Sequence, residues 1–77
     1  MNPLSNEVYI YISENPDISL PTIFKDLVVS QKMTHIMLRT ALRELIDLRV
    51  IQQIKDGDRE TYKLSSAEEI MNPPEHA

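Results

Sequence analysis

The segment from Thr34 to Leu64 constrains the fold more than any other part of this chain, because its apolar residues change their period halfway along. At first they recur at the three- and four-residue spacing of a helix that buries one face, made of Leu38, Ala41, Leu42, Leu45 and Leu48. Two short strand-like runs then follow at residues 50–54 and 60–64. A polar Lys55–Arg59 turn, holding the single Gly of the chain, separates them. The segment therefore predicts an amphipathic helix followed by a β-hairpin.

The first fifteen residues predict a helix. Asn2-Pro3 fits an N-cap followed by proline in the first turn, and Asn15-Pro16 fits a helix end. Apolar residues recur between them at helical spacing: Leu4, Val8, Tyr11 and Ile12. The same stretch also alternates as a strand would, at Val8, Ile10 and Ile12, so a strand is the alternative. We favour the helix because the caps and the length agree.

Residues 18–20 are expected to form a short extended piece between two prolines. Pro21 then opens a second helix whose inward-facing residues are Ile23, Phe24, Leu27 and Val28. Either Ser30 or Thr34 caps the third helix, and Ser30 would lengthen that helix by about one turn. The alternatives differ in where the helix begins, and Thr34 fits the register of its apolar face better.

Length and composition predict one small domain without a catalytic site. We expect residues 1–65 to fold, and residues 66–77 to form a short helical turn and a flexible tail. The chain has no Cys and two isolated His, so neither a disulfide nor a metal site is expected. One Gly cannot form a glycine-rich phosphate loop, and no His is placed to activate a nucleophile. We therefore expect no enzyme activity and no cofactor.

The chain lacks the features of a membrane or secreted protein. No run of 18 apolar residues is present, and the N-terminus lacks a basic region followed by an apolar core. These observations predict a cytoplasmic protein that does not cross a membrane.

Charge is unevenly distributed along the chain. The formal net charge is −4, which by itself argues against a nucleic-acid partner. However, all eight basic residues lie between positions 25 and 63, where six acidic residues leave a net charge of +2. The other six acids lie in flanks that contain no Lys or Arg. Because a partner that touches one face responds to the local charge, the central segment could still meet phosphate.

The helix and the start of the hairpin resemble the winged helix-turn-helix family. The residues that carry the resemblance are 38–45, Leu-Arg-Thr-Ala-Leu-Arg-Glu-Leu, and 48–51, Leu-Arg-Val-Ile. Repressors of the multiple-antibiotic-resistance and arsenic-repressor types likewise end their recognition helix in Ala-Leu-x-x-Leu and enter the wing through an apolar pair. The resemblance covers about residues 4–64 and implies an α+β fold of three helices with a C-terminal two-stranded β-hairpin wing. The chain departs from the family pattern in its longer segment between Leu27 and Thr34, and in having no room for added helices.

This resemblance implies a DNA-binding transcriptional regulator. Helix 3 would enter the major groove through one face, made of His35, Ile36, Arg39, Thr40 and Arg43. The wing would contact the flanking backbone through Lys55, Arg59 and Lys63. The alternatives without a binding role are an ordinary solvated helix face and a turn in which Asp56, Asp58 and Glu60 balance the charges of the hairpin cations.

The expected partners are double-stranded DNA and a second copy of the chain. Tyr9 and Ile10 fall off the inward stripe of the first helix, and together with Ile70 and Met71 they could form a dimer patch. The alternative function is a winged-helix protein–protein adaptor that does not bind DNA, in which the apolar and acidic flanks matter more than the basic face.

Overall fold

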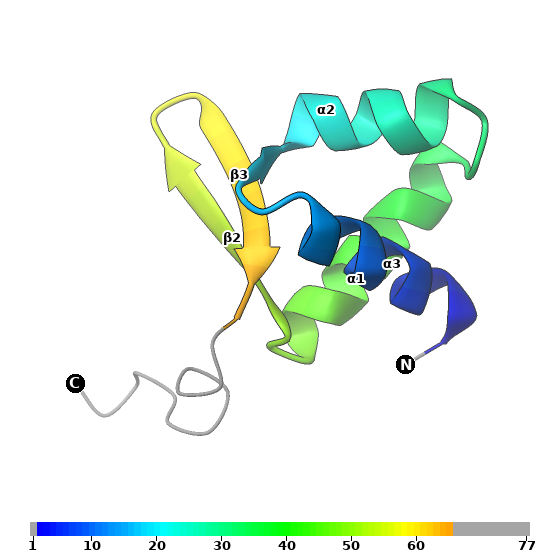
Figure 1. Ribbon diagram of the computed structural model, residues 1–77, viewed down its shortest axis with the longest axis horizontal. Coiled ribbons are helices and arrows are strands. Elements are labelled where there is room, and N and C mark those ends of the chain that lie inside the picture. The colour runs from blue at the N-terminus through cyan, green and yellow to red at the C-terminus, as the bar shows by residue number, and fades with distance from the viewer. Residues whose placement is uncertain (1, 66–77) are drawn as a thin grey trace.

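The computed structural model describes residues 2–65, which form an α+β fold of three helical segments and a small antiparallel sheet (Figure 1). The second helical segment changes from α-helix to π-helix partway along, and the two parts are labelled α2 and η1. In chain order the elements are α1 (Pro3–Glu14), β1 (Ile18–Ser19), α2 (Leu20–Phe24), η1 (Lys25–Val29), α3 (His35–Asp47), β2 (Ile51–Asp56) and β3 (Arg59–Leu64). This architecture is compatible with a winged-helix-like fold. The predicted turn and tail at residues 66–77 lie outside the described residues.

Side-chain caps begin α1 and α3 where the sequence predicts them, whereas α2 begins at Leu20 with Ser19 as its cap, one residue before the predicted start at Pro21. The Asn2 side-chain oxygen accepts a hydrogen bond from the Ser5 amide at 2.8 Å, and Pro3 occupies the first helical position. The helical prediction for the first segment is therefore confirmed. Thr34 Oγ1 accepts from the Met37 amide at 3.1 Å, so Thr34, not Ser30, caps α3.

The sheet differs from the predicted two-stranded hairpin. β1 pairs antiparallel with β3, with Ile18 opposite Tyr62 and Ser19 opposite Thr61, so the strand order is β1-β3-β2. The prediction was therefore wrong in the number and order of strands. Two residues are too few to show alternation, and their partner lies far along the chain, so no local pattern reveals this pairing.

The hairpin loop is also shorter than predicted. β2 continues to Asp56 and β3 starts at Arg59, which leaves Gly57 and Asp58 as the loop. Gly57 has a φ of +64°. Hairpins with two-residue loops favour positive φ at the first loop position, where Gly has no Cβ to clash.

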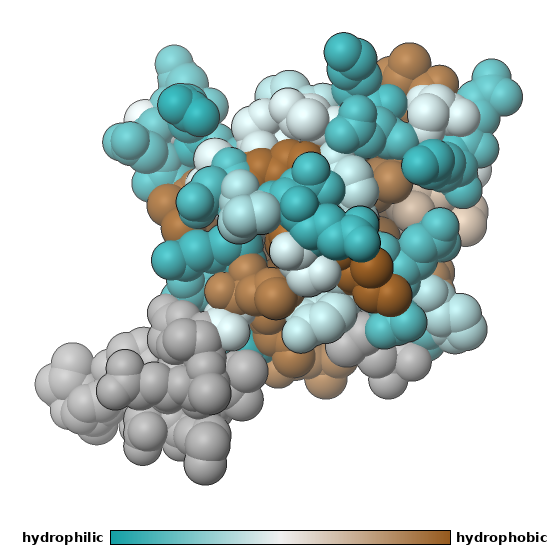
Figure 2. Space-filling view, viewed as in Figure 1, coloured by the Kyte–Doolittle hydropathy of each residue, from teal (hydrophilic) through white to brown (hydrophobic). Residues whose placement is uncertain are grey.

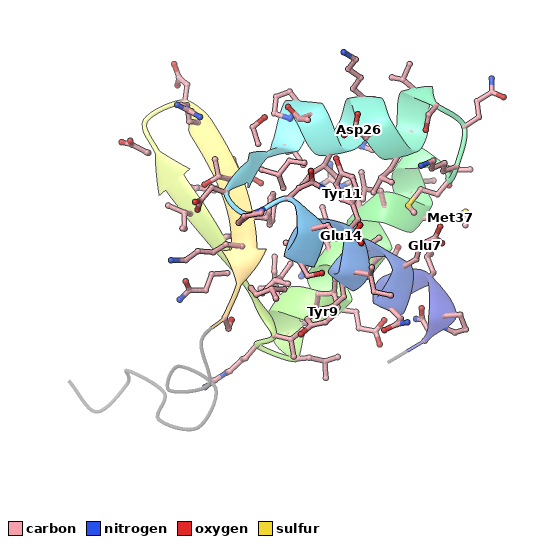
Figure 3. The ribbon with its side chains drawn as sticks, in the orientation of Figure 1. Glu7, Tyr9, Tyr11, Glu14, Asp26 and Met37 are labelled. Carbon is pink, nitrogen blue, oxygen red and sulfur yellow. The ribbon has the colours of Figure 1, made fainter. Side chains whose placement is uncertain are left out.

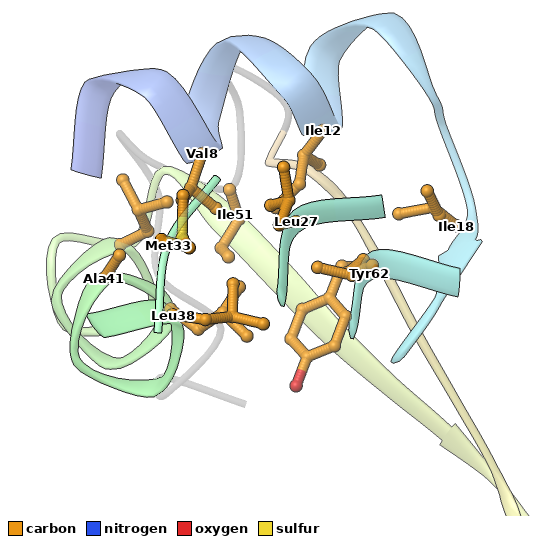
Figure 4. Close-up of a cluster of buried hydrophobic side chains, with 12 residues drawn as sticks. Val8, Ile12, Ile18, Leu27, Met33, Leu38, Ala41, Ile51 and Tyr62 are labelled. Carbon is orange, nitrogen blue, oxygen red and sulfur yellow. The ribbon is translucent and has the colours of Figure 1, made fainter. Parts of the chain in front are cut away.

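The core lies where α1 crosses α3 and meets the inner face of the sheet (Figures 1 and 4). Its buried apolar side chains are Val8, Ile12, Ile18, Ile23, Leu27, Met33, Leu38, Ala41, Leu42, Leu45, Ile51 and Tyr62. Leu64 and Phe24 pack against this core and remain partly exposed. Figure 4 shows the Tyr62 ring in the cluster with its hydroxyl pointing away from it.

The prediction that Leu48 is buried was wrong. α3 ends at Asp47, and Leu48 is 48% exposed. Leu48 is the C-cap of α3, and Arg49 then adopts a φ of +63°, which ends the helix and turns the chain toward β2. No helix within residues 2–65 is long and apolar enough to cross a membrane.

Candidate functional site

The outward face of α3 carries the predicted recognition residues. The opposite face of α3 packs into the core, so His35, Ile36, Arg39, Thr40 and Arg43 are all exposed. Ile36 is 76% exposed, although it is apolar. The amphipathic pattern of α3 thus positions a polar surface and one protruding apolar side chain.

An open groove runs along this surface between α2, α3 and the hairpin. Its lining residues come from all three elements: Leu20, Phe24, His35, Leu38, Arg39, Thr40, Leu42, Arg43, Ile46, Asp47, Gln53, Lys55, Glu60 and Tyr62. The fold therefore brings five of the eight predicted site residues together around one groove. The other three, Ile36, Arg59 and Lys63, do not line it.

The strand register explains why the hairpin cations separate. Lys55 pairs with Glu60 and Gln53 pairs with Tyr62, and because side chains alternate these four residues share the inner face, toward the groove. The outer face carries Gln52, Ile54, Asp56, Arg59, Thr61 and Lys63. Lys55 consequently lines the same groove as Arg39, whereas Arg59 and Lys63 lie on the other side of the sheet, with Arg59 next to the loop.

A polar network on the inner face fixes one carboxylate in the groove. Gln53 Nε2 donates to Glu60 Oε2 at 2.6 Å, and the Tyr62 hydroxyl donates to the same oxygen. Gln53 Nε2 also lies 3.3 Å from the Tyr62 hydroxyl oxygen. Because the Tyr62 ring is buried in the core, both packing and hydrogen bonds hold the inner face of the hairpin in place.

The pKa values of this network follow from its surroundings. The hydrogen bond from Tyr62 lowers the pKa of the Glu60 carboxyl, and the charges of Lys55 and Arg39 lower it further. Burial, followed by the contact with Glu60, raises the pKa of the Tyr62 hydroxyl above its ordinary value. At neutral pH the groove therefore contains a carboxylate held by a protonated tyrosine.

His35 is fixed at the start of α3 by a ring contact. The Phe24 and His35 rings meet edge to face, with centroids 5.1 Å apart and planes at 77°. Because Phe24 belongs to α2, this contact ties the beginning of α3 to the preceding helix.

Three further hydrogen bonds position α1 against α3 and η1. Glu44 of α3 accepts hydrogen bonds from the buried Ser5 hydroxyl and from Asn2 Nδ2, the latter at 2.8 Å. The Tyr11 hydroxyl of α1 donates to the Asp26 carboxylate of η1 (Figure 3). Burial and the nearby carboxylate raise the pKa of Tyr11 above its usual range. These contacts hold α1 against both α3 and η1.

Sequence reasoning missed the Gln53–Glu60–Tyr62 network and the anchoring role of Glu44. The register of a two-residue hairpin would have paired Gln53 with Tyr62 and Lys55 with Glu60, so the turn chemistry carried a usable signal. No comparable signal exists for Glu44, because Ser5 and Asn2 lie on a different helix.

The groove can attract an anion and can also form directional hydrogen bonds. Arg39, Arg43 and Lys55 supply cations, while Glu60 and Asp47 supply acceptors. Within residues 2–65 no group of three or more metal-binding side chains comes together. Comparison with known proteins finds no matching family model, curated protein or solved structure.

Proposed function

We propose that this protein is a DNA-binding transcriptional regulator that places α3 in the major groove. The observation that carries the proposal is the placement of three cations, Arg39, Arg43 and Lys55, around one groove beside the exposed face of α3. The two arginines come from a helix and the lysine from a hairpin. A duplex offers a matching surface, because base edges and phosphates lie side by side along the major groove.

The residues of α3 take unequal roles in this interface. Arg39 and Arg43, one helical turn apart, donate to guanine in the bidentate manner that arginine allows. Thr40 and His35 provide smaller polar contacts. Ile36, which is 76% exposed, contacts a thymine methyl group.

The hairpin contacts the backbone that flanks these bases. Lys55 faces the groove with Arg39, and Arg59 lies beside the loop, from which it reaches a flanking phosphate. Lys63 lies on the outer face, four positions along β3 from Arg59, and we propose that it does not contact the DNA. The central segment has a net charge of only +2, so sequence-independent affinity is expected to be weak.

We propose that the regulator acts as a homodimer through the outward face of α1. Ile10 is 47% exposed on this face, and Tyr9 beside it is partly buried. Figure 2, which views the molecule from the side of α1, shows hydrophilic side chains separated by apolar patches. Ile70 and Met71, also predicted to join the patch, lie outside the described residues. A two-fold dimer would bind two half-sites about one helical turn apart.

Replacing Ile10 with Glu tests the dimer proposal. The variant should be a folded monomer by light scattering and should bind a two-half-site duplex about a hundredfold more weakly, because linked binding is lost. Val29→Glu, the same kind of change at an exposed apolar residue of η1, is the control and should leave the mass unchanged. An unchanged mass for Ile10→Glu would exclude α1 as the contact.

A protein–protein adaptor is the second candidate function. The acceptors Asp47 and Glu60, together with apolar lining from Leu20 and Ile46, would suit a peptide that carries both basic and apolar side chains. Such a partner would meet the same groove in place of DNA.

A salt titration with DNA separates these two functions. The chain is first used to select duplexes from a random library, and binding to the selected duplex is compared with binding to a scrambled one. A DNA-binding protein should prefer the selected duplex, and log K should fall linearly with log salt concentration. If no sequence is enriched and binding does not depend on salt, DNA binding is excluded and the adaptor function is favoured.

A further inference from the structure

Glu60 differs from the other acids of the hairpin in how firmly it is held. Its Oε2 accepts from both Gln53 and Tyr62, and the Tyr62 ring is buried in the core. Asp58, in contrast, is an exposed loop residue. Glu60 therefore presents a fixed negative charge on the inner face of the wing, whereas Asp58 presents a charge at its solvent-exposed tip.

Glu60 places this negative charge among the cations of the groove. Glu60 lines the groove together with Arg39, Arg43 and Lys55, and it is the cross-strand partner of Lys55. Arg39 lines the same groove as Glu60 and Tyr62. A carboxylate among cations is unfavourable for a groove that only has to bind phosphate, because it weakens that attraction.

We infer that Glu60 is a specificity-determining residue, which disfavours phosphate in the groove and orients Arg39 toward the bases. The inference rests on the proposed DNA-binding function and adds to it the residue that controls the preference between sequences. A guanidinium has five donors in a planar fork. One edge can donate to Glu60 while the other donates to the O6 and N7 atoms of guanine.

This carboxylate has two effects on DNA binding. It lowers affinity for every duplex through repulsion of phosphate, and it raises the share of binding that depends on the base beside Arg39. Removing the charge should therefore strengthen binding to scrambled DNA and weaken the preference for the selected duplex. A residue that merely stabilised the hairpin would change neither ratio once the protein is folded.

The test compares Glu60→Gln with Asp58→Asn. Both changes remove one negative charge from the hairpin, but Asp58 lies in the loop, outside the groove lining. Circular dichroism first establishes that each variant is folded. The ratio of affinities for selected and scrambled duplexes should then fall about fivefold or more in Glu60→Gln, the change expected when one arginine–base contact loses its discrimination. In Asp58→Asn both affinities should rise together and the ratio should stay constant.

Failure of this inference is distinguishable from failure of the proposed function. If the parent prefers the selected duplex and Glu60→Gln retains the full ratio, only the role of Glu60 is overturned. If the parent prefers no duplex, the proposed function fails and the inference fails with it.

A double variant locates the effect at Arg39. In an Arg39→Ala background, adding Glu60→Gln should leave the ratio unchanged, because the side chain that Glu60 orients is gone. A further fivefold fall in that background would overturn the orientation of Arg39 by Glu60. NMR titration without DNA gives an independent readout: the Glu60 pKa should rise in Arg39→Ala, and an unchanged pKa would likewise overturn the coupling.

Discussion

The two faces of the β2–β3 hairpin are built from alternate residues of the same strands, yet they have different surroundings. On the inner face Ile51 and Tyr62 are buried, and Glu60 is held by two hydrogen bonds. On the outer face Ile54 is exposed, as is Arg59. The comparison shows that strand register, more than residue type, decides which of the hairpin charges can join those of α3.

The inner face of the hairpin both closes the core and lines the groove. Its end nearest α3 closes the core through Ile51, and its end nearest the loop lines the groove through Lys55 and Glu60. Tyr62 lies between them, with a buried ring and a hydroxyl in the polar network. Packing of the inner face therefore positions the groove residues, whereas the outer face can change with little effect on them.

Truncating Ile51 and Ile54 in turn should produce the largest contrast between the faces. Ile51 is 3% exposed and Ile54 is 36% exposed, and both lie in β2. Ile51→Ala should lower the free energy of unfolding by about 2–5 kcal/mol, because it leaves a cavity in the core. Ile54→Ala should cost about 1 kcal/mol or less. Urea unfolding measures both, and equal losses would contradict the division into two faces.

Removing the Tyr62 hydroxyl should have a smaller effect on stability. Tyr62→Phe keeps the buried ring and removes one hydrogen bond to Glu60, which should cost about 1 kcal/mol at neutral pH. Tyr9→Phe serves as the control, since Tyr9 is a partly buried tyrosine outside this network. Equal and negligible losses in the two variants would show that the network adds nothing to stability.

The raised tyrosine pKa values predict a loss of stability in alkali. Folded Tyr11 and Tyr62 keep their protons above the pKa of about 10 at which an unfolded tyrosine releases its own. The unfolded state then binds fewer protons than the folded state, so the free energy of unfolding falls as pH rises above about 10. The contribution is fully present below that pH. Urea midpoints at pH 8 to 11 should show a shallower fall in the Tyr11→Phe/Tyr62→Phe double variant, and an identical fall would contradict the assignment.

Lysines on opposite faces of the hairpin should differ in their effect on DNA binding. Lys55 lines the groove, whereas Lys63 lies on the outer face. Lys55→Ala should lower the slope of log K against log salt by about one, and Lys63→Ala should leave that slope unchanged. The two variants carry the same charge, so equal slopes would show that the protein senses overall charge and not the groove.

The sequence predicts the elements of this fold better than it predicts their pairing. Asn2, Pro3 and Thr34 mark helix starts through local hydrogen bonding, and the spacing from Leu38 to Leu45 marks the buried face of α3. These signals act within a few residues, so they can be read from the chain alone. The pairing of Ile18 with Tyr62 and the contact of Ser5 with Glu44 join distant segments, and neither has a local signature.

The candidate site follows the same division. The exposed face of α3 follows from its helical period, so His35, Ile36, Arg39, Thr40 and Arg43 could be predicted as a set. The hairpin charges could not be sorted without the register and the packing of the sheet against α3. Lys55 and Glu60 lie in the groove only because β2 and β3 turn their inner face toward that helix.

The measurement that tests the central claim most directly is binding of Arg39→Ala and Arg43→Ala to selected and scrambled duplexes at two salt concentrations, with Arg49→Ala as an exposed arginine control outside the groove. Each groove arginine should lose about 1–3 kcal/mol of discrimination at one base position, and Arg49→Ala should retain the parent's preference. All three variants should stay folded, because these side chains are exposed. If the parent prefers no duplex, or if both groove variants discriminate as the parent does, α3 does not read DNA.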